Sequence, residues 1–327
     1  MKKRILFTVS VFVFSMCFLL ITGCGNNKTI QTDSTQALKG VISISGAFAM
    51  YPIVVKWAEE FKKLHPDVKI DVSAGGAGKG MTDALSGMVD LGMVSRPISP
   101  EEINKGAWYI AITKDAVLPT INVKNPVIKE IMQQGLTKKQ LAEVFLSENK
   151  ISWGQLVKTN CTSKVVGYTR SDACGAAEMW GKYLGKNQES LTGIGVFGDP
   201  GIADAVKNDK NALGFNNVIY VFDIKTRKPY EGVTVLPIDL NENGKIDVDE
   251  NFYSSLDSIM NAISIGKYPS PPARDLYFVS NSVPKSYLVK AFIQWILSDG
   301  QKFIPEAGYV ALPADQIKTQ IEKLNKK

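Results

Sequence analysis

The strict alternation of apolar strands and amphipathic helices between residues 40 and 94 most constrains the fold. Strands are predicted from short apolar runs, and helices from apolar residues that recur every three or four positions. The alternating elements are expected over 41–45, 53–64, 68–72, 79–86 and 90–94. This βαβαβ order predicts a mostly parallel sheet covered by helices. Sheets of that kind bind ligands at the carboxyl ends of their strands.

The rest of the chain continues the alternation. Further strands are expected over 108–113, 120–123, 164–168, 214–222, 234–237 and 276–279. Further helices are expected over 137–145, 174–184, 252–265 and 286–297. A chain of 327 residues exceeds one typical domain and suits two lobes.

The first 23 residues are typical of a bacterial lipoprotein signal peptide. Three basic residues, an apolar run over 5–21 and the small pair Thr22-Gly23 precede Cys24. The four residues that end at Cys24 resemble a lipobox, so we expect Cys24 to be acylated and residues 24–37 to form a tether. The mature protein would be a soluble, extracytoplasmic body anchored to a membrane. The alternative is a transmembrane anchor, for which the run is marginal in length and lacks a basic stop-transfer cluster.

Composition excludes several classes of function. The net charge is +6, and removal of the three basic residues of the signal leaves about +3, too little to suggest nucleic-acid binding. His65 is the only histidine, which argues against a histidine triad or a multi-histidine metal site. Only Cys161 and Cys174 remain for the body, so the chain is not a disulfide scaffold. A predicted strand about 16 Å long separates these two cysteines, which disfavours their pairing.

Seven short motifs lie in order along the chain: Ile44–Pro52, Lys56–Phe61, Gly75–Gly80, Asp90–Arg96, Tyr168–Asp172, Tyr268–Tyr277 and Asp299–Lys302. In this order and spacing, over residues 40–313, they resemble the phosphate-binding proteins of bacterial ABC importers (the PstS type). The resemblance implies an α/β protein of the type II periplasmic-binding-protein fold, in which two α/β lobes joined by a two-stranded hinge close over an anion. Lobe one would comprise 38–118 plus 276–327, and lobe two 119–275.

The resemblance and the order of the elements together place the ligand at three strand-to-helix turns, over 46–50, 75–80 and 170–176. Helix N-termini present free N–H groups and a partial positive charge, which suits an oxyanion. Arg96 and Arg170 would add fixed charge and forked donors. Tight packing alone is the alternative reading of the glycine-rich turn. The expected ligand-binding residues are Ala49, Met50, Tyr51, Ala77, Gly78, Ser95, Arg96, Arg170, Asp172, Cys174, Gly175 and Ala176.

These turns depart from the family pattern. Family members usually carry hydroxyl residues at the first turn, where this chain has residues 47–50, and a serine where it has Ala77. The third turn usually reads Arg-x-Asp-Gly-Ser-Gly-Thr, whereas residues 170–176 replace the serine by Cys174 and the threonine by Ala176. Each lost hydrogen bond to a charged group is worth about 1.5–3 kcal/mol. A helix N-terminus beside Arg170 would lower the pKa of the Cys174 thiol, unless Cys174 is only a small buried residue.

Residues 239–250 fit the twelve-residue EF-hand loop pattern. Gly244 occupies the sixth position, and a helix is predicted to follow but not to precede the loop, so we expect structural Ca²⁺ rather than a calcium sensor. The alternative is an acidic surface turn. The expected ligands are Asp239, Asn241, Asn243, the carbonyl of Lys245, Asp247 and Glu250.

The sequence therefore predicts a monomeric, lipid-anchored solute-binding protein that takes a small oxyanion, with phosphate as the family default, and delivers it to an ABC permease. The same fold could instead serve as a sensory or scavenging protein for a less polar or thiol-compatible ligand. A third alternative is an enzyme that depends on Cys174. The absence of a histidine near Cys174 argues against catalysis, because a cysteine nucleophile usually has a base partner.

Overall fold

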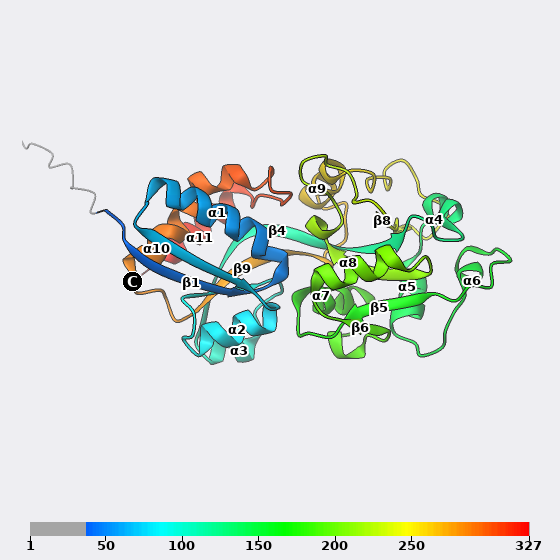
Figure 1. Ribbon diagram of the computed structural model, residues 1–327, viewed down its shortest axis with the longest axis horizontal. Helices are drawn as coiled ribbons and strands as arrows, with labels where there is room; N and C mark the ends of the chain where they lie inside the picture. The colour runs from blue at the N-terminus through cyan, green and yellow to red at the C-terminus, as the bar shows by residue number, and fades with distance from the viewer. Residues whose placement is uncertain (1–36, 327) are drawn as a thin grey trace, which may run out of the picture. The chain divides into compact units, whose positions relative to one another are not determined.

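The computed structural model describes residues 37–326, which form one compact unit (Figure 1). Residues 1–36, which hold the predicted signal peptide and Cys24, lie outside the described residues. The nine strands of the unit form one sheet in the order β2-β1-β3-β9-β4-β7-β5-β6, and β8 also pairs with β4. We call the parts on either side of β4 and β9 lobe one and lobe two.

Lobe one contains the alternation with which the chain begins. Its parallel strands are β1 (Gly40–Gly46), β2 (Val68–Ala74) and β3 (Leu91–Val94), with β1 in the middle. Helix α1 (Tyr51–Leu64) buries Trp57 and Phe61 on its apolar face, as its periodicity predicts. The other helices of this lobe are α2 (Ala77–Leu85), α3 (Pro100–Asn104), α10 (Tyr287–Ile296) and α11 (Ala314–Asn325).

The hinge consists of β4 (Ala107–Asn122) and β9 (Ala273–Asn281). Strand β4 pairs with β9 as far as Ala116 and with β7 from Val117 onward, so one strand serves both lobes. The prediction of two separate strands over 108–113 and 120–123 is therefore wrong. The polar pair Lys114-Asp115 interrupts the apolar pattern in the sequence, but both residues stay in the β4–β9 ladder.

Lobe two contains β5 (Val166–Arg170), β6 (Ile194–Val196), β7 (Ala212–Asn217) and β8 (Val233–Val235). Strand β7 ends at Asn217 and leads into a 3₁₀ helix over Val218–Tyr220, so the strand predicted over 214–222 is too long. Thr137 caps α5 through two bonds: its hydroxyl oxygen accepts from the N–H of Gln140, and the side-chain oxygen of Gln140 accepts from the N–H of Thr137. The helices are α4 (Ile128–Gln134), α5 (Lys138–Phe145), α6 (Trp153–Val157), α7 (Gly175–Leu184), α8 (Gly198–Asn208) and α9 (Leu256–Ser264).

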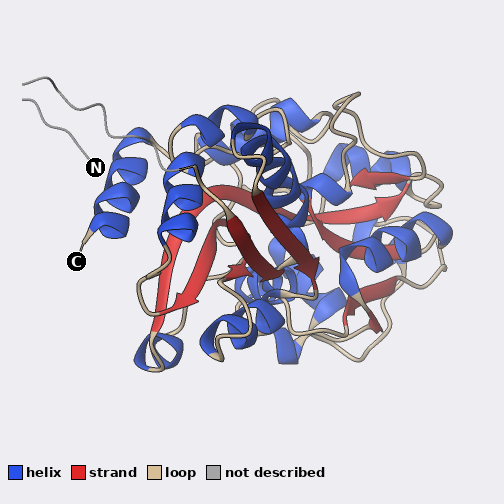
Figure 2. Cartoon of the chain, turned by 60° about the vertical axis from the view of Figure 1, so that its left-hand side comes forward, coloured by secondary structure: helices blue, strands red, loops and turns tan. Residues whose placement is uncertain are grey.

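Each lobe has its own hydrophobic core, and helices cover both faces of the sheet (Figure 2). Trp57 and Phe292 are among the largest fully buried side chains of lobe one, and Trp153 and Trp180 among those of lobe two. Within the described part of the chain, none of the helices has both the length and the apolar character that a membrane span requires. The two cores hold the lobes as separate bodies, and the turns described next lie where the bodies meet.

Candidate functional site

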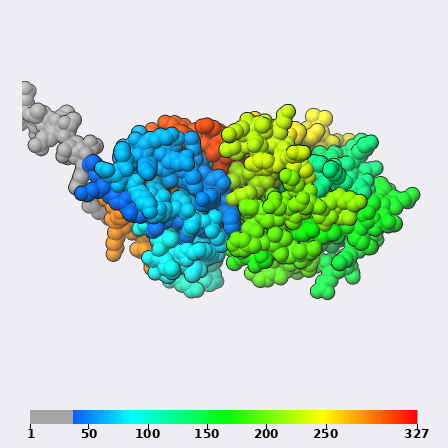
Figure 3. All heavy atoms as spheres, viewed as in Figure 1, coloured from blue at the N-terminus to red at the C-terminus, as the bar shows by residue number. Residues whose placement is uncertain are grey.

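The second and third turns are in direct contact across the seam between the lobes, which Figure 3 shows from one side. The N–H of Gly78 donates to the carbonyl of Ala173 at 3.1 Å. Gly175 packs so tightly against lobe one that a Cβ at this position would lie 2.3 Å from both the carbonyl and the hydroxyl oxygen of Ser95. A side chain larger than glycine would therefore force the two lobes apart.

The first turn also reaches the seam, through the side chain of Phe48. Its ring centroid lies 5.6 Å from the guanidinium carbon of Arg170 and 5.8 Å from the ring of Phe197, edge to face. The hydroxyl of Tyr220 donates to the carbonyl of Phe48 at 3.1 Å. Lobe one thus places an aromatic ring over the guanidinium group of lobe two, a favourable cation–π arrangement.

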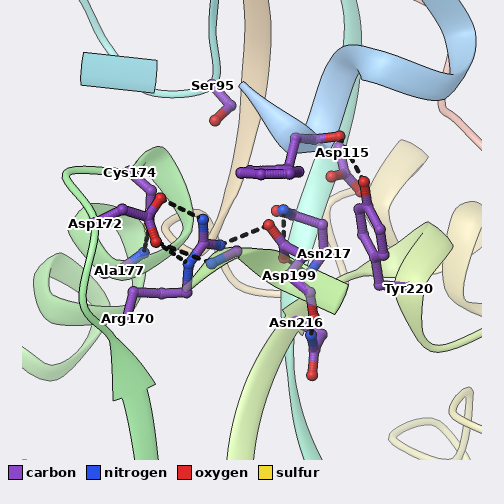
Figure 4. A network of polar contacts seen from close by, with 12 residues as sticks. Ser95, Asp115, Arg170, Asp172, Cys174, Ala177, Asp199, Asn216, Asn217 and Tyr220 are labelled. Atoms are coloured by element: carbon purple, nitrogen blue, oxygen red, sulfur yellow. Dashed lines mark hydrogen bonds and ion pairs between the residues drawn. The ribbon is translucent and has the colours of Figure 1, made fainter. Parts of the chain in front are cut away.

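Arg170 is buried and fully engaged by two carboxylates (Figure 4). Its Nε and Nη2 donate to Asp172 at 2.8 and 2.6 Å, and its Nη1 donates to Asp199 at 2.6 Å. Burial lowers the pKa of Arg170, but the adjacent carboxylates outweigh burial and raise this pKa above its ordinary value. One cation thus faces two carboxylates. The fixed charge expected at Arg170 is thus offset locally, and all three of its nitrogens donate to carboxylates.

Arg96 is also paired. Its Nη1 and Nη2 donate to the two carboxylate oxygens of Glu102 at 2.9 and 2.7 Å. The same carboxylate accepts from the N–H of Ser99, as part of the cap of α3. Arg96 therefore has a local carboxylate partner in lobe one, and its two terminal nitrogens are engaged there.

A buried chain of polar contacts continues from Arg170 to the hinge. Asp199 accepts from the side-chain amide of Asn217 at 2.7 Å, and the amide oxygen of Asn217 accepts from Nη2 of Arg274. Arg274 also donates from Nε to the carbonyl of Ser95 at 3.2 Å, and its Nη2 lies 3.6 Å from Asp115. Burial raises the pKa of Asp115 to about 6, although the charge of Arg274 opposes this shift.

Four residues of this buried polar network were not among the predicted site residues: Asp115, Asp199, Asn217 and Arg274. Arg274 lies within one of the recognised motifs, and Asp115 is a charged residue inside a predicted sheet, so both left a signal in the sequence. Asp199 stands in Gly198-Asp199-Pro200-Gly201, which looks like a turn but forms the first turn of α8, where proline is tolerated. Nothing in the sequence marks Asn217.

Cys174 caps helix α7, where its Sγ accepts from the N–H of Ala177 at 3.3 Å. Burial raises the pKa of its thiol to about 12, and the nearby Arg170 only partly opposes this shift. The expectation of a lowered pKa is therefore wrong, because the loss of water outweighs the charge and the helix terminus. Cys161 and Cys174 are both free.

Apart from Arg96, the expected ligand-binding residues lie in three places: the hydrophobic cores, the start of α1 and the seam. The side chains of Ala49, Met50, Ala77 and Ala176 are buried in the two hydrophobic cores, so these residues can offer a ligand only their backbone. Tyr51 is 36% exposed at the start of α1. The residues that meet at the seam are Gly78, Ser95, Arg170, Asp172, Cys174 and Gly175.

In the predicted calcium loop, the buried carboxylates of Asp239 and Glu250 accept hydrogen bonds from backbone N–H groups of the loop. Asp247 pairs with Lys245, accepts from two asparagine amides and has its pKa lowered to about 2 by these contacts, the first being that to Lys245. Across residues 37–326, no three His, Cys, Asp or Glu side chains lie close enough together to hold a metal ion as placed. The loop oxygens are thus satisfied by the loop itself.

Comparisons with known proteins agree with this architecture. A family model described as a PBP superfamily domain matches residues 30–300. The chain is 26% identical over 312 residues to the phosphate-binding protein PstS of Staphylococcus epidermidis, which covers 94% of this chain and 89% of the relative. It is 25% identical to the protein SphX of Synechococcus elongatus, with 87% of this chain and 81% of the relative covered.

Two solved structures share the fold. A protein from Clostridium perfringens, whose structure holds bound phosphate, gives a TM-score of 0.67 at 23% identity and covers 84% of this chain and 100% of its own. An ABC-type phosphate transport receptor from Vibrio cholerae gives a TM-score of 0.60 at 21% identity, with 83% and 100% covered. These likenesses, with the two α/β lobes and the shared strands β4 and β9, confirm the predicted type II periplasmic-binding-protein fold.

Proposed function

Because the chain belongs to the PBP superfamily, we propose that it is the substrate-binding protein of an ABC importer and that it holds a small oxyanion between its lobes. The names of its relatives describe phosphate-binding proteins and a phosphate transport receptor rather than enzymes. Phosphate is therefore the first ligand to test. The protein would act as a monomer and pass its ligand to a permease in the membrane.

The observation that carries this proposal is the way the seam holds a carboxylate. Asp172 accepts two hydrogen bonds from Arg170 and one, at 3.1 Å, from the N–H of Gly198 at the start of α8. A guanidinium fork and a helix N-terminus are the donors that oxyanions use in proteins. Gly175 and Ala176 begin α7 beside Ser95, and the helix offers their N–H groups no acceptor. Asp172 already occupies the fork and the N–H of Gly198, so the donors that the seam retains for a ligand are the N–H groups of Gly175 and Ala176.

A second candidate function follows from the charge balance of the seam. Arg170 is offset by Asp172 and Asp199, and the aromatic ring of Phe48 covers its face. A site of this kind also accommodates a less polar ligand, as a sensory or scavenging protein would require. The two functions differ in ligand class, so one screen separates them.

The screen measures the melting temperature of the protein against phosphate, arsenate, sulfate, molybdate and tungstate, with neutral apolar solutes as the second panel. A ligand that binds only the folded state raises the melting temperature by mass action. We expect phosphate or another oxyanion to raise it, and titration calorimetry to give one site per chain. If only neutral solutes raise the melting temperature, the second candidate function, a sensory or scavenging protein, would be favoured over oxyanion import. Genes for a permease and an ATPase beside this one would support import.

We further propose that Cys24 carries a lipid that holds the body outside the cytoplasm, and that the loop over 239–250 binds Ca²⁺. The lipid is supported by the signal-like sequence before Cys24. Calcium is supported by the filled ligand positions of the loop and by the burial of Asp239 and Glu250 at its two ends. A bound ion would have to draw these carboxylates away from the N–H groups that they accept from now.

A further inference from the structure

We propose that Arg274 of the hinge, rather than Arg170 of the third turn, is the cation that binds the oxyanion directly. The proposal rests on the proposed function, since it takes the ligand to be an anion. It assigns the ligand to the junction where β9, β4 and the ends of β3 and β7 meet. Arg170 then has a positioning role, in which it holds the third turn through its two carboxylates.

The donors of the two guanidinium groups are used differently. All three nitrogens of Arg170 donate to carboxylates. Arg274 donates from Nε and Nη2 to two neutral oxygens, on Ser95 and Asn217, while its Nη1 is buried and has no hydrogen-bond partner among residues 37–326. The side chain of Arg274 is only 2% exposed. A buried donor on a charged group costs free energy unless it finds an acceptor, and an oxyanion supplies one.

Asp115 does not meet this need in the structure. Its nearest carboxylate oxygen lies 3.6 Å from Nη2 of Arg274, and neither of its oxygens has a hydrogen-bond partner within the described part of the chain. The backbone N–H groups of Ala116 and Val218 face the carboxylate and lower its pKa without reaching hydrogen-bond geometry. The hinge therefore holds a charged donor and a charged acceptor that are close but not bonded to each other.

Arg274 lies where one side chain can contact both lobes and a ligand between them. It contacts Ser95 of lobe one and Asn217 of lobe two while standing on a hinge strand. It also lines a crevice of about 750 Å³ at the hinge, together with Lys114 and Lys182. Those two lysines have carboxylate partners in Asp275 and Glu178. An anion that enters from this side passes along paired lysines toward the one guanidinium group of the crevice that retains a donor.

Asp115 gives the proposal a second, independent signature. An ionised carboxylate beside Arg274 opposes an anion, and a protonated one does not. Burial raises the pKa of Asp115 to about 6, so its charge changes within an accessible range. The charged and titratable groups that face it are Arg274, Asp199, Tyr220, Tyr268 and Tyr309. The tyrosines stay neutral there, because burial raises their pKa values.

The test compares Arg274→Gln with Asp115→Asn by titration calorimetry with inorganic phosphate at pH 7.5, with melting temperatures recorded in parallel. We expect Arg274→Gln to weaken phosphate binding at least thirtyfold and Asp115→Asn to strengthen it severalfold. A purely structural pair would instead lose affinity in both variants, in step with stability. Arg274→Lys, which keeps the charge but not the fork, should fall between wild type and Arg274→Gln.

The pH dependence is read as the ratio of the Asp115→Asn affinity to that of wild type, which cancels the titration of phosphate itself. We expect this ratio to shrink toward one as the pH falls from 7.5 to 5.5. If Arg274→Gln does not fold, Arg274→Lys and Asp115→Asn decide the question. Phosphate binding within threefold of wild type in Arg274→Gln, or weaker binding in Asp115→Asn, would overturn the proposal and leave the proposed function standing. A wild-type protein that binds no oxyanion would overturn both.

Discussion

Asp199 accepts a 2.6 Å hydrogen bond from Nη1 of Arg170, and each of the two side chains is only 1% exposed. The two residues come from different elements, the end of β5 and the start of α8. With Asp172 they form a buried group of three charges beneath the ring of Phe48. These three charges hold the third turn in place without the help of a ligand.

Removal of Arg170 should therefore affect stability first. Arg170→Met leaves two buried carboxylates without their counter-charge, and breaking a buried pair from one side costs about 3–5 kcal/mol. Urea denaturation should show a loss of this size. The control is Lys182→Met, which breaks the more exposed pair with Glu178 and should lose less than about 1 kcal/mol. Equal losses in the two variants would contradict the structural role of Arg170.

Cys174 should be inert toward thiol reagents in the folded protein. Because burial raises the pKa of its thiol to about 12, the thiolate is scarce at pH 8 and increases only as the pH approaches that value. Iodoacetamide labelling followed by peptide mass spectrometry should modify the half-buried Cys161 well before Cys174, and both in urea. Modification of Cys174 at the rate of Cys161 in the native protein would show a low pKa after all.

The pH dependence of stability should carry the mark of Asp115. Its pKa rises from 3.8 to about 6 on folding, so the folded state binds the proton more tightly. The stabilisation from this proton is complete below about pH 4 and is lost as the pH rises through 6. Unfolding free energies of wild type, relative to Asp115→Asn, should fall between pH 4 and pH 7. A constant difference across this range would mean that Asp115 is charged throughout.

Calcium should stabilise the protein through the loop over 239–250. Millimolar Ca²⁺ added to chelator-treated protein should raise the melting temperature, because the ion binds the folded state. Asp239→Ala and Glu250→Ala should abolish the gain, whereas Asp249→Ala, at a non-ligand position of the same loop, should keep it. Anion affinity should not depend on calcium. A melting temperature that ignores both calcium and chelator would make the loop an acidic turn.

The predicted lipid can be tested by fractionation. Cys24→Ser removes the acylated sulfur, so the protein should move from the membrane fraction to the soluble fraction of the cells that express it. Labelling with a fatty-acid analogue should be lost in the same variant. Retention of Cys24→Ser in the membrane fraction would favour an uncleaved apolar anchor over a lipid.

The apolar periodicity and the order of the elements were enough to predict much of the fold, but not the continuous strand of the hinge. The parallel strands β1 to β3 and helix α1 follow from local apolar patterns, which tertiary contacts reinforce. The continuity of β4 does not, because Asp115 looks like a break until Arg274 is seen beside it. These two residues are far apart in the sequence, so their proximity inside the hinge is visible only in the fold.

The same limit applies to the site. The prediction that Arg170 lies at a strand-to-helix turn follows from the motif, and the structure places it there. Its charge is balanced by Asp199, 29 residues away on a helix whose first turn looks like a loop in the sequence. Likewise, a helix N-terminus beside an arginine suggests an acidic thiol at Cys174, but its degree of burial is a tertiary property. The sequence therefore predicts which residues stand at the turn, but not the distant carboxylate or the burial that sets their charge balance and pKa.

Strand β4 has a consequence for how the protein can be divided. Its first ten residues complete the sheet of lobe one beside β9, and its remaining residues pair with β7 along one edge and with β8 along the other. Wherever the chain is cut near the hinge, one half loses a strand that its sheet requires. The lobes are thus not exchangeable modules: neither can be grafted onto another receptor, or produced alone as a soluble half, unless the borrowed strand travels with it.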